Sequence, residues 1–161
     1  MRKRTSSKTT QQPTTSEASS NALDGYWTGA HTTHRLRFHL VWVPKYRRRV
    51  LEEPIATRLT YLLRQACEIN CWGIEELNIQ LDHVHLLLQV SPKDSVMKVM
   101  QLLKGGTAKV LRAEFPRLVE YLWGDSFWSD GYFAETVGQT QEAILRAYIK
   151  NEAVKAERTK R

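Results

Sequence analysis

The chain has 161 residues, a formal net charge of +7 and only two cysteines. This length fits one folded domain with its own core. Two cysteines are too few for a disulfide-stapled secreted protein or a four-cysteine zinc site, so we expect Cys67 and Cys71 to be reduced core thiols. No apolar run approaches the length of a membrane span. The composition therefore predicts a cytoplasmic protein with no membrane association, and its basic balance favours nucleic acid as a partner.

The first 30 residues differ in composition from the rest of the chain. They are rich in serine and threonine, begin with Arg2-Lys3-Arg4 and show no helical or strand periodicity. This pattern predicts a flexible tail over residues 1–30. A transit peptide is the weaker interpretation, because the Arg-rich amphipathic pattern is missing. We expect the folded domain over 31–155 and a short basic tail over 156–161.

Strands and helices alternate after this tail. The expected elements are, in order, a strand over 35–43 ended by Pro44, a helix from Pro54 to near Gly73, strands over 74–80 and 81–90, and a helix from a cap at Asp94 or Ser95 to Phe115-Pro116. The apolar stripes expected on the two helices are Ile55, Leu59, Leu62, Leu63, Ala66 and Ile69, then Val96, Val99, Met100, Leu103, Val110 and Leu111.

Two glycines, Gly105 and Gly106, lie inside the second expected helix. Each costs roughly 1 kcal/mol relative to alanine in a helix interior, so a compensating role is expected. A nucleic acid strand or the sheet could approach closely there. The alternative is a kink, or a break between two shorter helices.

The last third of the chain contains an aromatic segment and a final helix. Residues 123–137 include an Asp-Gly turn and predict a hairpin or a bent edge strand. The final helix is expected to be capped near Thr140. It carries Tyr148 and Glu152 at positions i and i+4, about 6 Å apart on one face.

Two histidines stand out in the strand expected over 81–90. His83 and His85 are separated by one residue, so in an extended strand they point to the same side, away from the apolar side chains of Val84 and Leu86. Two neutral imidazoles suit a divalent cation, but they leave the site incomplete. The alternative is a pair of half-buried strand histidines. The spacing of His31, His34 and His39 does not support a metal site, and we assign them tail and strand roles.

Basic residues suggest where DNA would lie. A run over 45–49 places Tyr46 among cations directly after a strand, and such a run serves either as a solvated turn or as a grip on phosphates and bases. In the second helix, several cations share the face opposite the apolar stripe. The candidate DNA contacts are Lys45, Arg47, Lys98, Lys109 and Arg112.

Four blocks of sequence together resemble the single-tyrosine HUH transposases of the insertion-sequence 200/605 family. They are Phe38-His39-Leu40-Val41-Trp42-Val43-Pro44-Lys45-Tyr46-Arg47, Asp82-His83-Val84-His85-Leu86-Leu87, Phe127-Trp128-Ser129-Asp130-Gly131-Tyr132-Phe133, and Tyr148-Ile149 with Asn151-Glu152. The resemblance covers roughly residues 32–153. It implies an α+β, ferredoxin-like (RRM-like) antiparallel sheet with helices on one face, plus a C-terminal helix that carries the tyrosine.

The resemblance also implies an enzyme, a metal-dependent single-strand DNA endonuclease and strand transferase. Such a transposase cleaves and rejoins single-stranded transposon ends at hairpins through a 5′-phosphotyrosine intermediate. It acts as a homodimer with Mg²⁺ or Mn²⁺ and without a nucleotide cofactor. Carried over by position, Tyr148 is the catalytic nucleophile, and His83, His85 and Glu152 are the metal ligands. The family usually has glutamine where Glu152 stands, so equivalence at this position is an open question.

Two other functions fit the same sequence. One is a domesticated or non-catalytic protein that binds hairpin single-stranded DNA, suggested by Glu152 and the long N-terminal tail. The other is an RNA-binding or phosphodiesterase domain on a similar sandwich. A paired-histidine phosphodiesterase would need a second His-x-Thr/Ser motif, and the predicted folded part has none.

Overall fold

The computed structural model describes residues 25–122 and 126–159, and it divides the chain into two compact units, 1–33 and 34–161. Where the first unit ends, strands β1 (Trp27–Thr28) and β2 (Thr33–His34) form a small two-stranded sheet. The predictions for residues 1–24 lie outside the described residues.

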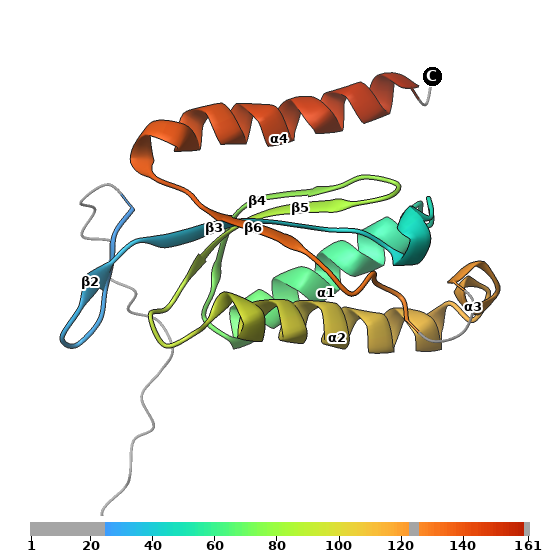
Figure 1. Ribbon diagram of the computed structural model, residues 1–161, viewed down its shortest axis with the longest axis horizontal. Coiled ribbons are helices and arrows are strands. Elements are labelled where there is room, and N and C mark those ends of the chain that lie inside the picture. Colours follow the sequence, from blue (N-terminus) through green and yellow to red (C-terminus); the bar gives the residue numbers. More distant parts are fainter. Residues whose placement is uncertain (1–24, 123–125, 160–161) are drawn as a thin grey trace, which may run out of the picture. The chain divides into compact units, whose positions relative to one another are not determined.

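The second unit is built on a four-stranded antiparallel sheet (Figure 1). Its elements are β3 (Leu36–Trp42), the 3₁₀ turn η1 (Lys45–Arg47), α1 (Ile55–Ile69), β4 (Gly73–Ile79), β5 (Val84–Val90), α2 (Val96–Glu114), α3 (Leu118–Leu122), β6 (Phe133–Thr136) and α4 (Gln139–Thr159). The strand order is β4-β5-β3-β6. This βαββαβ order with α4 appended is the ferredoxin-like α+β fold that the sequence predicted, and the prediction is confirmed.

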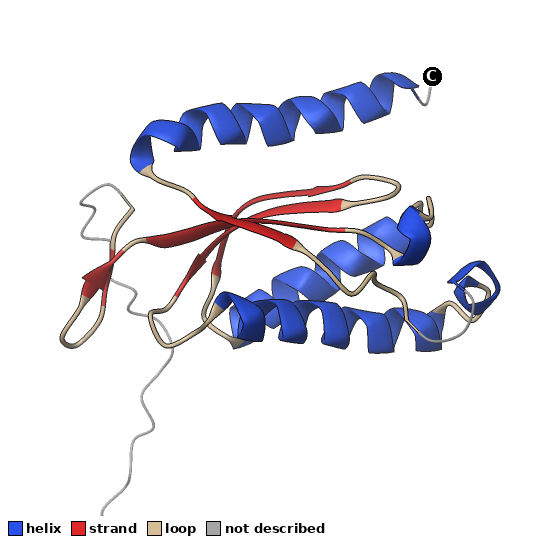
Figure 2. Cartoon of the chain, in the orientation of Figure 1, coloured by secondary structure: helices blue, strands red, loops and turns tan. Residues whose placement is uncertain are grey.

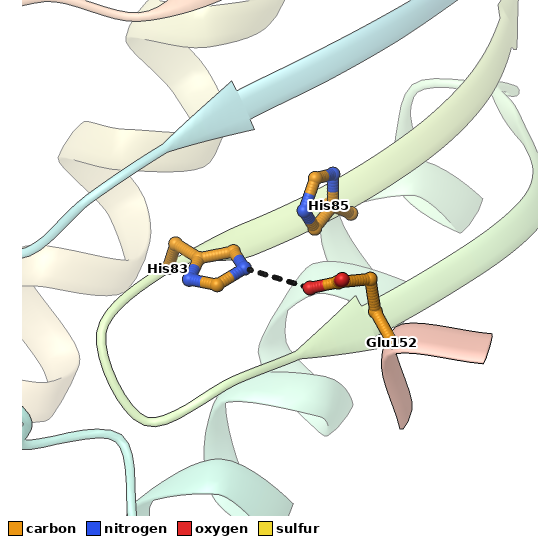
Figure 3. A group of neighbouring side chains, drawn as sticks. All are labelled: His83, His85 and Glu152. Carbon is orange, nitrogen blue, oxygen red and sulfur yellow. Dashed lines mark ion pairs between the residues drawn. The ribbon is translucent and has the colours of Figure 1, made fainter. Parts of the chain in front are cut away.

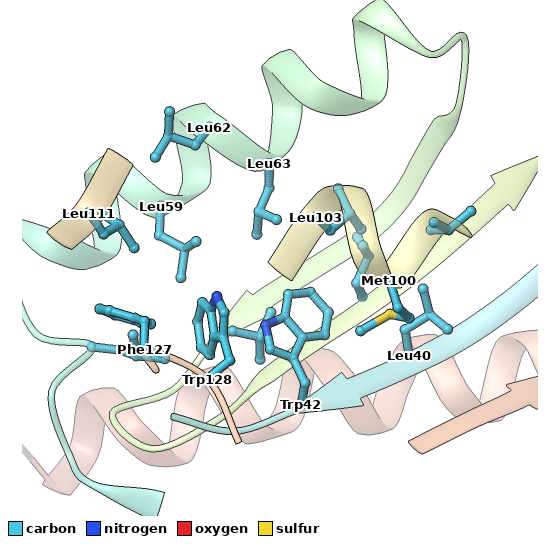
Figure 4. Packing of buried hydrophobic residues seen from close by; sticks show 14 of the residues in the cluster. Leu40, Trp42, Leu59, Leu62, Leu63, Met100, Leu103, Leu111, Phe127 and Trp128 are labelled. Atoms are coloured by element: carbon cyan, nitrogen blue, oxygen red, sulfur yellow. The ribbon is translucent and has the colours of Figure 1, made fainter. Parts of the chain in front are cut away.

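The two faces of the sheet are covered by different helices. Figures 1 and 2 show α1 and α2 against one face and α4 across the other. The main core lies on the α1 and α2 side, where Trp42 and Trp128 meet edge to face with ring centroids 5.9 Å apart (Figure 4). None of the described helices is both long enough and apolar enough to cross a bilayer.

Strand β5 is buried along its whole length because both of its faces are covered. Val84, Leu86 and Leu88 belong to the main core, whereas Leu87 packs in a separate cluster with α4. Successive side chains of a strand point to opposite faces, so His85 shares the α4 side with Leu87. The predicted division of this strand into an apolar face and a histidine face is confirmed.

Helix α2 runs without a break through Gly105 and Gly106. A Cβ atom added at either glycine would meet no other atom within 4 Å. The predicted kink or break is therefore wrong, and the sheet does not approach these glycines closely. Ser95 is the N-cap of this helix, because its side chain accepts a hydrogen bond from the backbone N–H of Lys98, and this decides between the two predicted caps.

Three further details correct the sequence analysis. Ile69 is 73% exposed, because α1 ends there and Cys67 takes the last buried position. Cys71 is exposed in the turn after α1, so only Cys67 is a core thiol. Of the two predictions for the aromatic segment, the edge strand is confirmed, since β6 pairs with β3 at the edge of the sheet, and no hairpin forms within the described residues; Trp128 makes an isolated β-bridge with Pro44.

The open space at Gly106 gives a test of the fold. Gly106→Ala should raise the free energy of unfolding by about 0.5–1 kcal/mol, because alanine restricts the unfolded chain and meets nothing in the folded one. Denaturant unfolding followed by circular dichroism measures the change. The reverse change at an exposed position of the same helix, Ala113→Gly, should lower stability. A loss of stability in Gly106→Ala would contradict the open environment.

Candidate active site

Helix α4 lies across the sheet on a small apolar cluster. Leu87 of β5, Val137 and Ile149 are buried together, with Leu145 packed against them. Ile149 and Leu87 are fully buried. Because Ile149 follows Tyr148 directly and precedes Glu152 by three residues, its burial fixes how both of these side chains are presented.

Polar contacts hold the same helix along its first half. Arg37 of β3 is buried between the carboxylates of Glu75 and Glu142, and Arg146 pairs with the same two carboxylates at 2.8 and 2.9 Å. The side-chain amide of Asn78 donates a hydrogen bond of 2.8 Å to the carbonyl of Ile149. These contacts tie α4 to strands β3 and β4.

Three side chains meet at the beginning of β5, where α4 passes over the strand (Figure 3). One possible ligand atom from each of His83, His85 and Glu152 lies within 4.8 Å of the other two. His83 Nε2 is 4.0 Å from Glu152 Oε2, and Figure 3 shows the three side chains converging from the β5 loop, from β5 and from α4. The residues expected to form the metal site are therefore neighbours in one chain.

Each histidine is also held from its other ring nitrogen. His83 Nδ1 is 2.6 Å from Asp82 Oδ1. His85 Nδ1 is 3.0 Å from His39 Nε2, and His39 Nδ1 is 2.9 Å from Glu135 Oε1. In both site histidines Nδ1 is thus engaged, and Nε2 is the ring nitrogen that remains for a ligand.

The donor set fits a divalent cation. Burial, followed by the neighbouring charges of His83 and His39, lowers the pKa of His85 from 6.5 to about 4, so this imidazole is neutral at physiological pH. A neutral imidazole is the form that binds metal. Mg²⁺ prefers a shell made entirely of oxygen ligands. Two imidazoles and one carboxylate therefore suit a transition ion such as Mn²⁺ better than they suit Mg²⁺.

Tyr148 stands beside this group. Its ring meets the ring of His85 edge to face, with centroids 6.0 Å apart. The residue is 50% exposed, so it lies at the surface and is open to solvent. A nucleophile candidate, three ligand candidates and an open approach therefore occur together.

The five basic residues proposed for DNA contacts separate into two groups. Arg47 donates from Nε to Asp82 Oδ2 at 2.9 Å, which places η1 beside the His83 loop, and Lys45 lies in the same turn. Lys98, Lys109 and Arg112 are on α2, on the opposite side of the sheet from α4 (Figure 1). Lys98 is paired with Asp94 at 2.7 Å. Of the five candidates, Arg47 is therefore the one with a contact to the neighbour of His83, and Lys45 lies in the same turn.

Three residues around the site could not be assigned their contacts from the sequence. His39 was given only a strand role, Glu135 was not considered, and Asp82 was noted only in the motif. The signal for Asp82 was its place next to His83. His39 and Glu135 lie opposite each other in the β3–β6 register, a pairing that requires the sheet order and is not apparent along the chain.

The chain also matches known proteins over the region that forms this site. A family model described as "Transposase IS200 like" matches residues 32–152. The chain belongs to the IS200-like transposase family. The resemblance stated from the four sequence blocks is confirmed, and membership makes this chain one of a family of enzymes that cleave DNA and transfer its strands.

Individual relatives agree with the family assignment of this transposase. It is 32% identical over 124 residues to the ISDra2 transposase TnpA of Deinococcus radiodurans, covering 77% of this chain and 89% of that protein. It is 35% identical over 123 residues to the transposase for insertion sequence element IS200 of Salmonella typhimurium, covering 76% and 80%.

Solved structures share the fold of this transposase. A crystal structure of a Deinococcus radiodurans R1 protein described as a transposase superimposes with a TM-score of 0.65 at 32% identity, covering 77% of this chain and 95% of that one. A REP-associated tyrosine transposase bound to a REP hairpin matches with a TM-score of 0.56 at 11% identity, covering 80% and 72%. At that identity the second match shows the fold alone.

The buried arginine under α4 gives a test of how the tyrosine helix is held. Arg37→Met removes the shared partner of two carboxylates and should destabilise the docked helix by about 1–3 kcal/mol. Hydrogen exchange of α4 amides should become faster. The control is Arg58→Met, which breaks an exposed pair with Glu114 and should leave α4 exchange unchanged. Equal exchange in both variants would show that the ion network does not hold α4.

Proposed function

We propose that this transposase cleaves and rejoins single-stranded transposon ends at DNA hairpins through a 5′-phosphotyrosine intermediate. The observation that carries the proposal is the meeting of Tyr148 with His83, His85 and Glu152 in a chain of this family. The hairpin substrate is what the family resemblance implies, and a solved structure of the same fold is a REP-associated tyrosine transposase bound to a REP hairpin. The proposal includes a homodimer, as the family resemblance implies.

The chemistry assigned to the chain is a reversible exchange of phosphodiester bonds. The Tyr148 oxygen attacks the scissile phosphorus, the bond to the 3′ oxygen breaks, and a free 3′-hydroxyl leaves while the 5′ phosphate stays on the tyrosine. The phenol loses its proton as the new bond forms, and the departing oxygen gains one. Attack by a 3′-hydroxyl on the phosphotyrosine reverses these changes, so no nucleotide cofactor is needed.

His83, His85 and Glu152 would hold the divalent cation. When bound there, a cation would polarise the phosphate and stabilise the negative charge on the attacking oxygen of Tyr148. Tyr148 is placed by the packing of Ile149, so the phenol is set beside the ligands before DNA arrives. Arg47, held to Asp82, is the cation best placed to receive a DNA phosphate near the histidines.

The covalent step gives the main test. Wild-type protein, Mn²⁺ and a labelled hairpin oligonucleotide with a flanking cleavage site should yield a protein–DNA adduct on a denaturing gel. Tyr148→Phe should yield none, because the attacking oxygen is absent. Tyr121→Phe, an exposed tyrosine on α3, is the matched control and should form the adduct normally.

The third ligand is tested with the same assay. Glu152→Gln should keep adduct formation, because an amide oxygen can still bind the cation, whereas Glu152→Leu should lose it.

An adduct that persists in Tyr148→Phe would remove this tyrosine from its role. Hairpin binding without an adduct in wild type would favour the non-catalytic binding protein instead.

The contribution of α2 to binding is tested by salt dependence. Lys109 is exposed on this helix, and a contact from it to a hairpin stem phosphate would release about one counterion. Lys109→Ala should then reduce the slope of log binding constant against log salt by about 0.9. Arg64→Ala on α1, outside the five candidates, should leave the slope unchanged. An unchanged slope in Lys109→Ala would exclude this contact.

A further inference from the structure

A line of hydrogen-bonding groups leads from the surface of the sheet to the metal-site histidine. Glu135 Oε1 lies 2.9 Å from His39 Nδ1, and His39 Nε2 lies 3.0 Å from His85 Nδ1. The two imidazole rings are nearly parallel, at 8°, with centroids 5.3 Å apart. Both histidines are buried, while the Glu135 side chain is 48% exposed. The line crosses three adjacent strands, β6, β3 and β5.

The positions of the protons along this line follow from what each group can donate or accept. An ionised carboxylate only accepts, so His39 Nδ1 carries the proton of the bond to Glu135. In a neutral imidazole the other nitrogen then has a lone pair, so His39 Nε2 accepts from His85 Nδ1. His85 Nδ1 is the protonated nitrogen, and His85 Nε2 keeps its lone pair for a ligand.

We propose that Glu135 and His39 are positioning residues that hold His85 in the tautomer and orientation in which its Nε2 binds the divalent cation. The inference rests on the proposed function, whose metal site it explains. Neither residue touches the cation or DNA in this role. Each acts through the hydrogen bond it makes.

His83 is held in the same tautomer by a direct hydrogen bond to a carboxylate. The carboxylate of Asp82 accepts directly from His83 Nδ1 at 2.6 Å, which leaves His83 Nε2 free on the side of Glu152. No carboxylate contacts His85 Nδ1 among the described residues. The His39 ring therefore provides the link between that nitrogen and Glu135.

The test removes the acceptor at the exposed end of the line. Glu135→Met keeps the length of the side chain but cannot accept the hydrogen bond, and Glu135→Gln restores a neutral acceptor. Mn²⁺ affinity of the full chain, measured by electron paramagnetic resonance, should fall about 10–100-fold in Glu135→Met. It should fall less in Glu135→Gln. Glu120→Gln, the same charge change at an exposed position of α3, should bind like wild type.

The tautomer itself provides a readout that does not depend on metal or activity. Long-range ¹H–¹⁵N correlation spectra of the metal-free protein should show His85 protonated at Nδ1 in wild type and losing this preference in Glu135→Met. A wild-type His85 protonated at Nε2 would overturn the inference. So would an unchanged Nδ1 preference in Glu135→Met.

A second variant separates the hydrogen-bonded line from a simple charge effect. His39→Phe interrupts the line, so adding Glu135→Met to it should cause no further loss of Mn²⁺ affinity. A further loss would mean that the Glu135 charge acts on the cation directly, and would overturn the positioning role. Failure of the proposed function gives a different result: no Tyr148 adduct in wild type while the His85 tautomer still depends on Glu135.

Discussion

The buried contact of α4 with β5 is the constraint on which the site depends. Ile149 and Leu87 pack in one apolar cluster, and each has chemically active neighbours at a fixed spacing. His85 lies two residues before Leu87 and on the same face of the strand. On the helix, Tyr148 directly precedes Ile149, and Glu152 follows it by three residues. One hydrophobic contact therefore sets the helix over the strand so that phenol, carboxylate and imidazole meet.

The two faces of the sheet differ in the side chains that they bury. The face under α1 and α2 is packed with apolar side chains of the main core. The face under α4 combines the small apolar cluster around Ile149 with buried polar groups, among them Arg37, His39, Asn78 and His85. Each of these four has a described hydrogen-bonding or ion-pair partner, as burial of polar groups requires. An extensive apolar core on one face offsets the cost of polar burial on the other.

Features within one element could be predicted from the sequence. The alternation in residues 84–90 and the spacing of Tyr148 and Glu152 follow from strand and helix geometry, which is local. Features that depend on neighbouring strands could not. The role of His39 requires knowing that β3 lies between β5 and β6, and the edge position of β6 depends on pairing between distant segments. The exposure of Ile69 was missed because helical periodicity does not show where a helix leaves the core.

Strand β6 is short and pairs on one side, so its register with β3 affects the residues around His39. This strand has four residues, is hydrogen-bonded only to β3, and is separated from α4 by Val137 and Gly138. A slip of two residues would keep every side chain on its own face but shift the strand by about 7 Å. Phe133 or Val137 would then stand opposite His39, and the start of the tyrosine helix would move with it. The alignment of this short strand thus sets both which residue stands opposite His39 and where the chain enters α4.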